Sequence, residues 1–184
     1  EAIMQRAFEP YVTTKTKGAG LGLFLSKELV NLLGLPHEKF RDRTLLPFAT
    51  SVVDRIEINT KESFALDRGT NGAWQIVQPF RARADTAAVG RFFESLSKLE
   101  IKHFTKDVET DFSSWGLAKP VSQYVLKSTL TNNAGITNRI VAQVDFGTNN
   151  AEEVFVRRGS EPSVYAVSYF DSVRLPNAAF EMRD

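Results

Sequence analysis

A glycine-rich stretch near the start of the chain holds the residues best suited to chemistry. Gly18, Gly20 and Gly22 alternate with small or apolar residues, and an apolar segment with helical spacing follows. Glycines at a loop-to-helix junction let backbone N–H groups approach an anion, and the N-terminus of the helix adds a positive dipole end. Lys15 lies just upstream, where it could reach phosphate oxygens. The pattern indicates binding of nucleotide phosphates.

The same stretch resembles the ATP-binding domain of bacterial sensor histidine kinases. Residues 8–11 (FEPY) match its F box, residues 18–23 (GAGLGL) match its second glycine box, and the following helix is also similar. In that family the glycine box contacts the triphosphate and the F box belongs to the mobile ATP lid. The resemblance covers residues 2–34. It implies ATP and magnesium as ligands, with Lys15, Gly18, Gly20 and Gly22 as the binding residues.

The kinase-like segment is truncated. The family's boxes that hold magnesium and read adenine would lie upstream of Glu1, and they are missing from the sequence. A lid without its pocket has few groups to bind a nucleotide, so we expect this segment to serve as a helix. A sensor-kinase fragment with residual affinity for nucleotide phosphate remains the alternative.

The rest of the chain has no catalytic or metal-binding signature. There is no cysteine, and the two histidines, His37 and His103, stand apart without a carboxylate cluster. Two isolated histidines make no metal site, so we predict no catalytic residue, no metal and no cofactor. The string at residues 111–117 (DFSSWGL) predicts one helical turn that ends at Gly116 and packs as a plug in the core, with a binding role for Trp115 as the alternative.

Composition restricts the partners. The net charge is +1, from 23 basic and 22 acidic residues, which gives no electrostatic case for nucleic acid. No apolar run is long enough to span a bilayer, so we expect no direct membrane insertion. The chain begins at Glu1 rather than Met, from which we expect it to be an excised piece of a longer protein.

Hydrophobic periodicity predicts the elements. Short strand-like runs occur at residues 52–59, 63–68 and 74–80, with a hairpin turn at 69–72. Asp85 can cap a helix whose apolar face is Val89, Phe92, Phe93 and Leu96.

After residue 123 the pattern has period two. Ile140, Ala142, Val144 and Phe146 form the apolar side of one strand, whose other side includes Asp145. Turns are expected at residues 132–135, 147–150 and 159–162. The fold class is therefore α+β, a mainly antiparallel meander with one main amphipathic helix on a face. Residues 22–33, ending near Gly34, add an N-terminal helical appendage, so we predict domains at 1–35 and 36–184.

A short echo links the two ends of the second region. Residues 38–43 (EKFRDR) and 180–184 (FEMRD) both place a phenylalanine shortly before arginine and aspartate. If the echo is not chance, it indicates one unit of a tandem repeat.

Five motifs in order resemble the bacterial domain-of-unknown-function family 4340. They are FRDRTLLPF, VVDRIEI, the block from WQIVQPF to SLSKLE, WGLAKP and VYAVSYF, and they cover residues 38–184. Members of that family are often repeated in one chain, tend to be tethered in the envelope, and are encoded beside gliding-type ABC transporters. The resemblance implies a non-enzymatic interaction or structural module with a protein partner, in an ABC-transporter-associated complex. It also implies an envelope location for residues 36–184, whereas a native kinase-like segment would imply the cytoplasm.

Overall fold

The structure is a computed structural model that describes residues 29, 34, 40–132, 135–159 and 161–184. The chain divides into two compact units, Glu1–Asp42 and Arg43–Asp184, and every element below belongs to the second. The helix predicted at residues 22–33 and the boundary predicted after residue 35 lie largely outside the described residues. Of the described ones, Gly34 has a positive φ of 61°, the conformation expected after a helix C-terminus.

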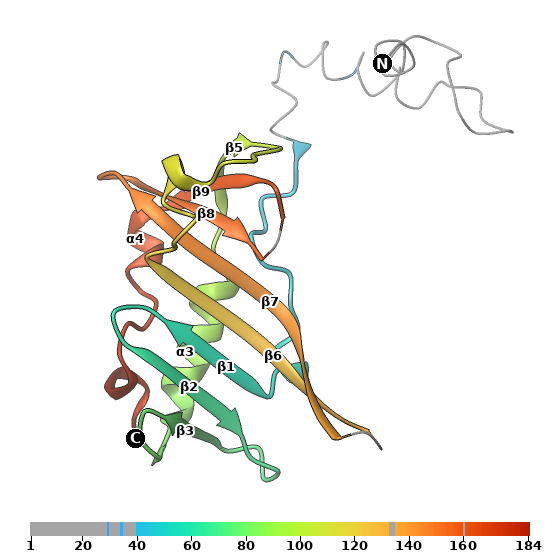
Figure 1. The fold of residues 1–184 in the computed structure, drawn as a ribbon, viewed down its shortest axis with the longest axis vertical. Helices are drawn as coiled ribbons and strands as arrows, with labels where there is room; N and C mark the ends of the chain where they lie inside the picture. Colours follow the sequence, from blue (N-terminus) through green and yellow to red (C-terminus); the bar gives the residue numbers. More distant parts are fainter. Residues whose placement is uncertain (1–28, 30–33, 35–39, 133–134, 160) are drawn as a thin grey trace, which may run out of the picture. The chain divides into compact units, whose positions relative to one another are not determined.

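One antiparallel sheet dominates the second unit (Figure 1). Its strand order is β4-β3-β2-β1-β6-β7-β8-β9-β5. The elements are η2 (Thr50–Val52), β1 (Arg55–Asn59), β2 (Ser63–Arg68), β3 (Trp74–Gln78), β4 (Ala82–Arg83), α3 (Thr86–Ser97), β5 (Ile101–Lys106), η3 (Ser113–Trp115), β6 (Ser122–Asn132), β7 (Gly135–Asn149), β8 (Glu153–Arg158), β9 (Val164–Ser168), α4 (Tyr169–Ser172) and η4 (Ala179–Met182). The predicted α+β class is confirmed, although the sheet consists of two meanders joined at β1 and β6.

Helix α3 forms where the sequence predicts it. The Asp85 side chain accepts a hydrogen bond from the backbone N–H of Ala87 (2.8 Å), which satisfies one of the free donors of the first turn. Helical spacing then gathers the apolar residues on one side, and the buried ones are Ala88, Val89, Phe92, Phe93 and Leu96. This side packs against the sheet and forms the main core with it.

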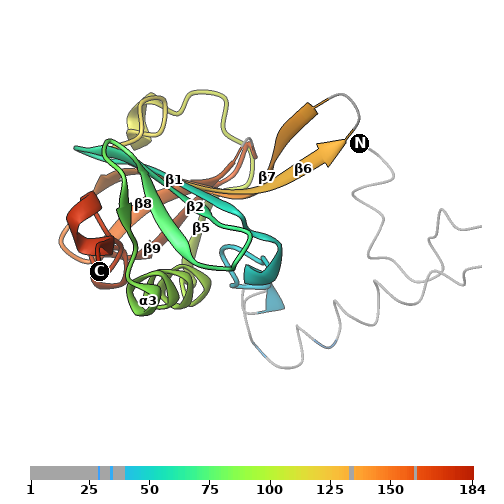
Figure 2. The same ribbon diagram turned by 90° about the horizontal axis from the view of Figure 1, so that it is seen from below.

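The two faces of the sheet are covered by different segments (Figure 2). Helix α3 lies on one face, and the yellow-green segment at residues 107–121 crosses the other. This segment includes the predicted turn, η3, closed by Gly116 with φ 68°. Its Leu117 is fully buried, while Trp115 is only half-buried and packs edge-on to Phe155, with ring centroids 4.8 Å apart. The predicted plug therefore exists, but it covers the face opposite the main core.

The predicted apolar side of β7 is wrong at Ile140, because the strand contains a β-bulge. The register shifts so that Ala142 faces Leu126 while Ile140 faces the next residue of β6, Lys127. One residue of β7, Val141, is thereby left without a partner, and the alternation of side chains reverses. As a result Ile140 is exposed, and Val141 packs against the core instead.

The turn predicted at residues 147–150 is also wrong. Strand β7 continues to Asn149, and Gly147 lies within it. A Cβ atom at Gly147 would overlap the backbone carbonyl oxygen of Trp115. This glycine therefore permits a close approach of two backbones rather than a turn.

Strands β1 to β4 and β6 to β9 are related by an approximate two-fold axis normal to the sheet. Ile56 pairs with Leu126 and Ile58 with Tyr124, so exchange of β1 and β6 leaves the register unchanged about Glu57. Each central strand continues outward through three further antiparallel strands in sequence order. We call residues 43–106 the first half and residues 107–184 the second half.

The two halves also exchange their last segments. Strand β5 of the first half pairs with β9, the outermost meander strand of the second half. In the opposite direction, Arg183 of the second half forms a bridge with Ala84, and the Asp184 N–H donates to the carbonyl of Arg83 (3.2 Å) beside β4. The exchange follows the same two-fold relation.

A sequence repeat supports this relation. Residues 67–71 (DRGTN) end β2 and enter its hairpin turn, and residues 145–149 (DFGTN) end β7. Arg55 of β1 donates to the aspartate of the first copy (2.7 Å), and Gln123 of β6 donates to the aspartate of the second (2.8 Å). The repeat therefore occupies equivalent places and makes equivalent contacts.

Candidate interaction site

An apolar recess of the second unit lies where several segments meet at one end of β6 and β7. We call it the end pocket, and its volume is about 400 Å³. Its lining residues are Thr60, Lys61, Val121, Ser122, Tyr124, Phe146, Gly147, Asn149, Val154, Tyr169, Ser172, Val173 and Asn177. They come from the β1–β2 turn, three strands, α4 and the segment after α4.

Buried aromatic residues form a fixed floor for the end pocket. The ring of Tyr124 meets that of Phe146 nearly at a right angle, with centroids 5.6 Å apart, a favourable edge-to-face arrangement. The Tyr124 hydroxyl donates to the carbonyl of Pro176 (3.2 Å), which ties the segment after α4 to β6. Burial raises the pKa of this phenol well above its ordinary value, so it stays neutral and keeps the bond.

The rim of the end pocket exposes large apolar side chains. Val121 is 67% exposed and Val173 is 50% exposed, and both line the recess. On α4, next along the chain, Phe170 is 68% exposed. Lys61 is the one charged side chain in the lining, and it forms no ion pair with any residue that the structure describes. The recess thus combines apolar walls with a single cation.

A second groove, of about 550 Å³, runs beside α3 and has a different character. Its charged lining residues are Arg91, Glu94, Lys98, Asp171, Arg174 and Glu181. Lys98 pairs with Glu94 at 2.5 Å. Arg174 lies 3.9 Å from Asp171. Because these charges of opposite sign neutralise one another, the groove offers a weaker case for a ligand than the end pocket.

A buried carboxylate lies on the face covered by residues 107–121. Asp145 is 1% exposed and accepts hydrogen bonds from Gln123 (2.8 Å), Gln143 (3.0 Å) and Arg157 (2.8 Å). The Arg157 guanidinium also stacks on the ring of Phe112, 4.5 Å from its centroid. The carboxylate oxygens are fully engaged, so this cluster holds the covering segment in place and has no free acid for catalysis.

An open ladder of charges occupies the same face in the first half. Glu57 accepts hydrogen bonds from Arg55 (2.7 Å) and Lys127 (2.6 Å), and Arg55 also bonds Asp67 (2.7 Å). Burial alone would raise the pKa of Glu57, but the hydrogen bonds from Lys127 and Arg55 outweigh it and hold the pKa below its ordinary value. The ladder is neutral and satisfied within itself.

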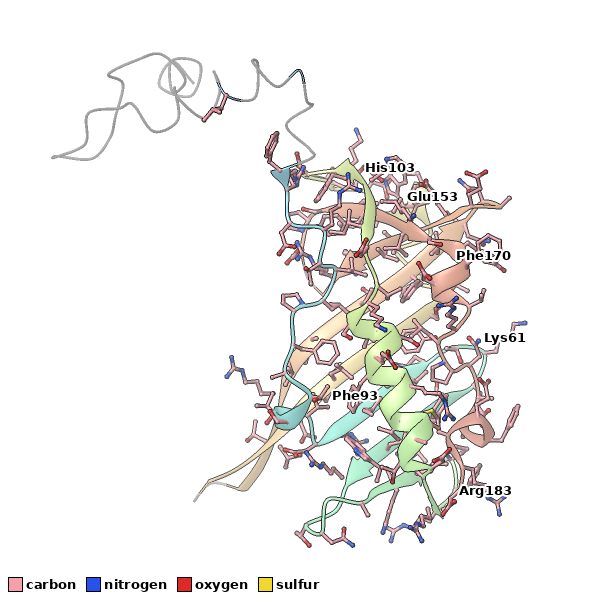
Figure 3. All side chains as sticks on the ribbon, turned by 180° about the vertical axis from the view of Figure 1, so that it is seen from behind. Lys61, Phe93, His103, Glu153, Phe170 and Arg183 are labelled. Carbon is pink, nitrogen blue, oxygen red and sulfur yellow. The ribbon has the colours of Figure 1, made fainter. Side chains whose placement is uncertain are left out.

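The site residues predicted from the sequence lie outside the part of the chain that the structure describes. Lys15, Gly18, Gly20, Gly22 and His37 lie outside the described residues, so nucleotide binding stays a prediction. His103 is on β5, as expected of a strand residue, with its Nε2 3.0 Å from Glu153 Oε1 on β8. Figure 3 shows this pair at one end of the sheet. In the described part of the chain, no group of three metal-ligating side chains occurs.

Sequence reasoning missed the end pocket. Its walls come from segments far apart in the chain, and Val121 and Val173 do not stand out among other valines. One available signal was overlooked, the DxGTN repeat at residues 67–71 and 145–149. That repeat indicates that the domain consists of two comparable halves. Comparing the two halves then draws attention to the end pocket, because the halves differ there.

These features define an α+β antiparallel-sheet domain with an apolar recess at its end. The chain matches the family described as Domain of unknown function (DUF4340) over residues 24–120 and 74–184, and it belongs to that family. The predicted resemblance of residues 38–184 to this family is thereby confirmed, and the match begins at residue 24, inside the kinase-like segment 2–34; the resemblance to sensor histidine kinases is not shown. No curated protein and no solved structure matches the chain. No helix among the described residues is both long and apolar enough to cross a membrane.

Proposed function

We propose that the chain is a non-catalytic interaction module of a bacterial envelope or transporter-associated protein, and that it binds a protein partner at the end pocket. The observation that carries this proposal is the exposed apolar rim. Val121 and Val173 keep large apolar surfaces in water at a recess already lined by buried aromatic residues, and Phe170 does so next to the lining residue Tyr169. Clustered apolar surface of this kind marks interaction sites more often than isolated exposed residues do.

The chemistry of the pocket lining supports binding over catalysis. Its one charged group is Lys61, and its deepest hydroxyl, that of Tyr124, is already bonded to Pro176. General acid–base catalysis needs a positioned group that can exchange a proton with a substrate. An apolar recess with a fixed floor and one cation is instead suited to anchor a side chain of a partner.

The test is the effect of rim charges on association. We expect Val173→Asp or Val121→Asp to weaken binding of the native partner at least tenfold, measured by calorimetry with the purified partner after crosslinking in the envelope fraction identifies it. Phe180→Glu is the matched control, because Phe180 is 72% exposed but does not line the pocket. Equal binding by all three variants would refute the proposal.

The kinase-like alternative has its own test. A fragment with residual phosphate affinity should release heat when the full chain is titrated with magnesium-ATP, and Gly20→Ala should reduce that heat. An absence of heat at millimolar nucleotide would end this alternative. Nucleotide turnover by the purified chain, abolished by a point substitution, would instead overturn the non-catalytic module.

A further inference from the structure

In the first half, an apolar segment packs beside α3. This segment is residues 45–48 (LLPF), which lie between α3 and the start of β1. Leu45 and Leu46 are buried, and the Leu45 N–H donates to the carbonyl of Leu99 (3.2 Å) just after α3. The ring of Phe48 packs on that of Phe93, with centroids 6.1 Å apart. One aromatic and two aliphatic side chains thus close this end of the first half.

The two-fold relation links the end pocket to this segment through one residue pair: Phe48 packs on Phe93, and the counterpart of Phe93, Phe170, adjoins Tyr169 of the pocket lining. Val53 comes three residues before the first inward residue of β1, and Val121 comes three residues before Tyr124, the first inward residue of β6. The helices also correspond, because residues 93–96 (FESL) of α3 resemble residues 170–173 (FDSV) at α4. Figure 3 shows residues 43–53 along the Phe93 side of α3, and Phe170 and Lys61 along the opposite margin.

The leading segment of the second half does not fill its own place. Residues 107–121 cross to the opposite face, where the Thr148 hydroxyl donates to the carbonyl of Trp115 (3.1 Å). Asp145 and Arg157 hold the same segment through Phe112. Of this segment only Val121 reaches the end pocket, so in the described part of the chain no segment takes the place there that Phe48 takes beside α3.

We infer that the end pocket binds an extended segment of a protein partner that carries aliphatic and aromatic side chains, as residues 45–48 do within the chain. The inference rests on the proposed function and specifies the partner's chemistry. Lys61, the only charged group in the lining, selects a partner segment with a carboxylate beside the apolar residues. A volume of about 400 Å³ is of the size that small binding sites have.

The chain supplies its own probe. A fluorescein-labelled peptide with the sequence of residues 44–49, TLLPFA, preceded by two aspartates, is titrated with the full chain and followed by fluorescence anisotropy. We expect saturable binding with a Kd on the order of 100 µM, as for a single short anchor segment. A peptide with alanine in place of its phenylalanine should bind at least tenfold more weakly.

Variants of the protein locate the site. Val173→Asp should weaken binding of the peptide at least tenfold. Lys61→Glu should make a peptide with two leading lysines bind better than the one with two leading aspartates, the reverse of the wild-type preference. Val108→Asp is the control, since Val108 is 71% exposed and does not line the pocket. All three positions are exposed, so thermal unfolding should confirm that the variants fold.

The outcomes separate this inference from the proposed function. Absence of saturable anisotropy change up to about 1 mM of the full chain, or binding unaffected by Val173→Asp, overturns the inference. A different result is that the peptide fails to bind while Val173→Asp still abolishes binding of a native partner. In that case the inferred chemistry of the partner segment is wrong, but the proposed interaction module stands. Competition between the peptide and that partner supports both.

Discussion

The two halves of the sheet share one frame but differ in what covers them. In the first half, α3 and residues 45–48 close the core side, and no segment that the structure describes covers the opposite face. In the second half, residues 107–121 close the opposite face, and the core side keeps the end pocket. The comparison teaches that the path of one leading segment decides which surface of a half is available to a partner.

The two aspartates of the DxGTN repeat differ in burial, and this difference should change how much each contributes to the unfolding free energy. Asp67 and Asp145 occupy equivalent places, and each accepts a hydrogen bond from the strand beside it. The side chain of Asp67 is 43% exposed, whereas that of Asp145 is 1% exposed. The covering segment thus converts a surface ion pair into a buried one, which changes what its loss costs.

The largest effect should come from breaking the buried pair. Asp145→Ala leaves the Arg157 guanidinium without its carboxylate under the covering segment. We expect a loss of about 3 kcal/mol in the free energy of unfolding, measured by urea titration. The equivalent Asp67→Ala should cost at most about 1 kcal/mol, because solvent screens that pair.

The proposed difference between the two halves is contradicted if Asp145→Ala and Asp67→Ala lower the unfolding free energy by equally small amounts. That result would mean that residues 107–121 do not exclude water from Asp145. A double variant with Trp115→Ala refines the test, since loosening the cover should bring the cost of Asp145→Ala closer to that of Asp67→Ala.

A smaller effect should separate the two glycines of the repeat. In Gly147→Ala the new methyl overlaps the backbone of Trp115, so we expect a loss of about 2 kcal/mol in unfolding free energy. In Gly69→Ala the methyl meets chiefly the Asn71 side chain, which can move, and the cost should stay below about 1 kcal/mol. Equal melting temperatures for both variants would contradict the close approach at Gly147.

The smallest expected effect is the contribution of Glu57 to the pH dependence of the unfolding free energy. The pKa of Glu57 is lower in the folded chain, so its contribution is present above the unfolded pKa and is lost as pH falls through the folded one. Between roughly pH 5 and 3, the wild type should lose under about 1 kcal/mol relative to Glu57→Gln. Its two-fold counterpart, Val125, does not titrate, so Val125→Ala should leave the pH slope unchanged. Parallel pH profiles for the wild type and Glu57→Gln would exclude this contribution.

The sequence predicts what local rules decide. Asp85 caps α3, and Phe92 and Phe93 fall on its buried face, because capping and helical periodicity depend on near neighbours. The hairpin of β2 and β3 follows from its turn residues for the same reason.

Contacts between distant segments escape such rules. The burial of Asp145 depends on residues 107–121 crossing its face, and the strand conformation of Gly147 depends on Trp115. The exposure of Ile140 follows from a bulge that alternation alone does not reveal. The end pocket is the extreme case, because no single stretch of the chain contains its walls.

The exchanged end segments have a consequence for biosynthesis. As the chain leaves the ribosome, β5 is made before β9, the strand that it pairs with. The backbone N–H and C=O groups of β5 therefore stay unpaired until more than fifty further residues have been made. Residues near Ala84 likewise wait for Arg183. The first half therefore cannot complete folding during its own synthesis, and non-local pairing of this kind slows folding. A nascent chain stalled before β9 should carry an unpaired strand that attracts chaperones or aggregates.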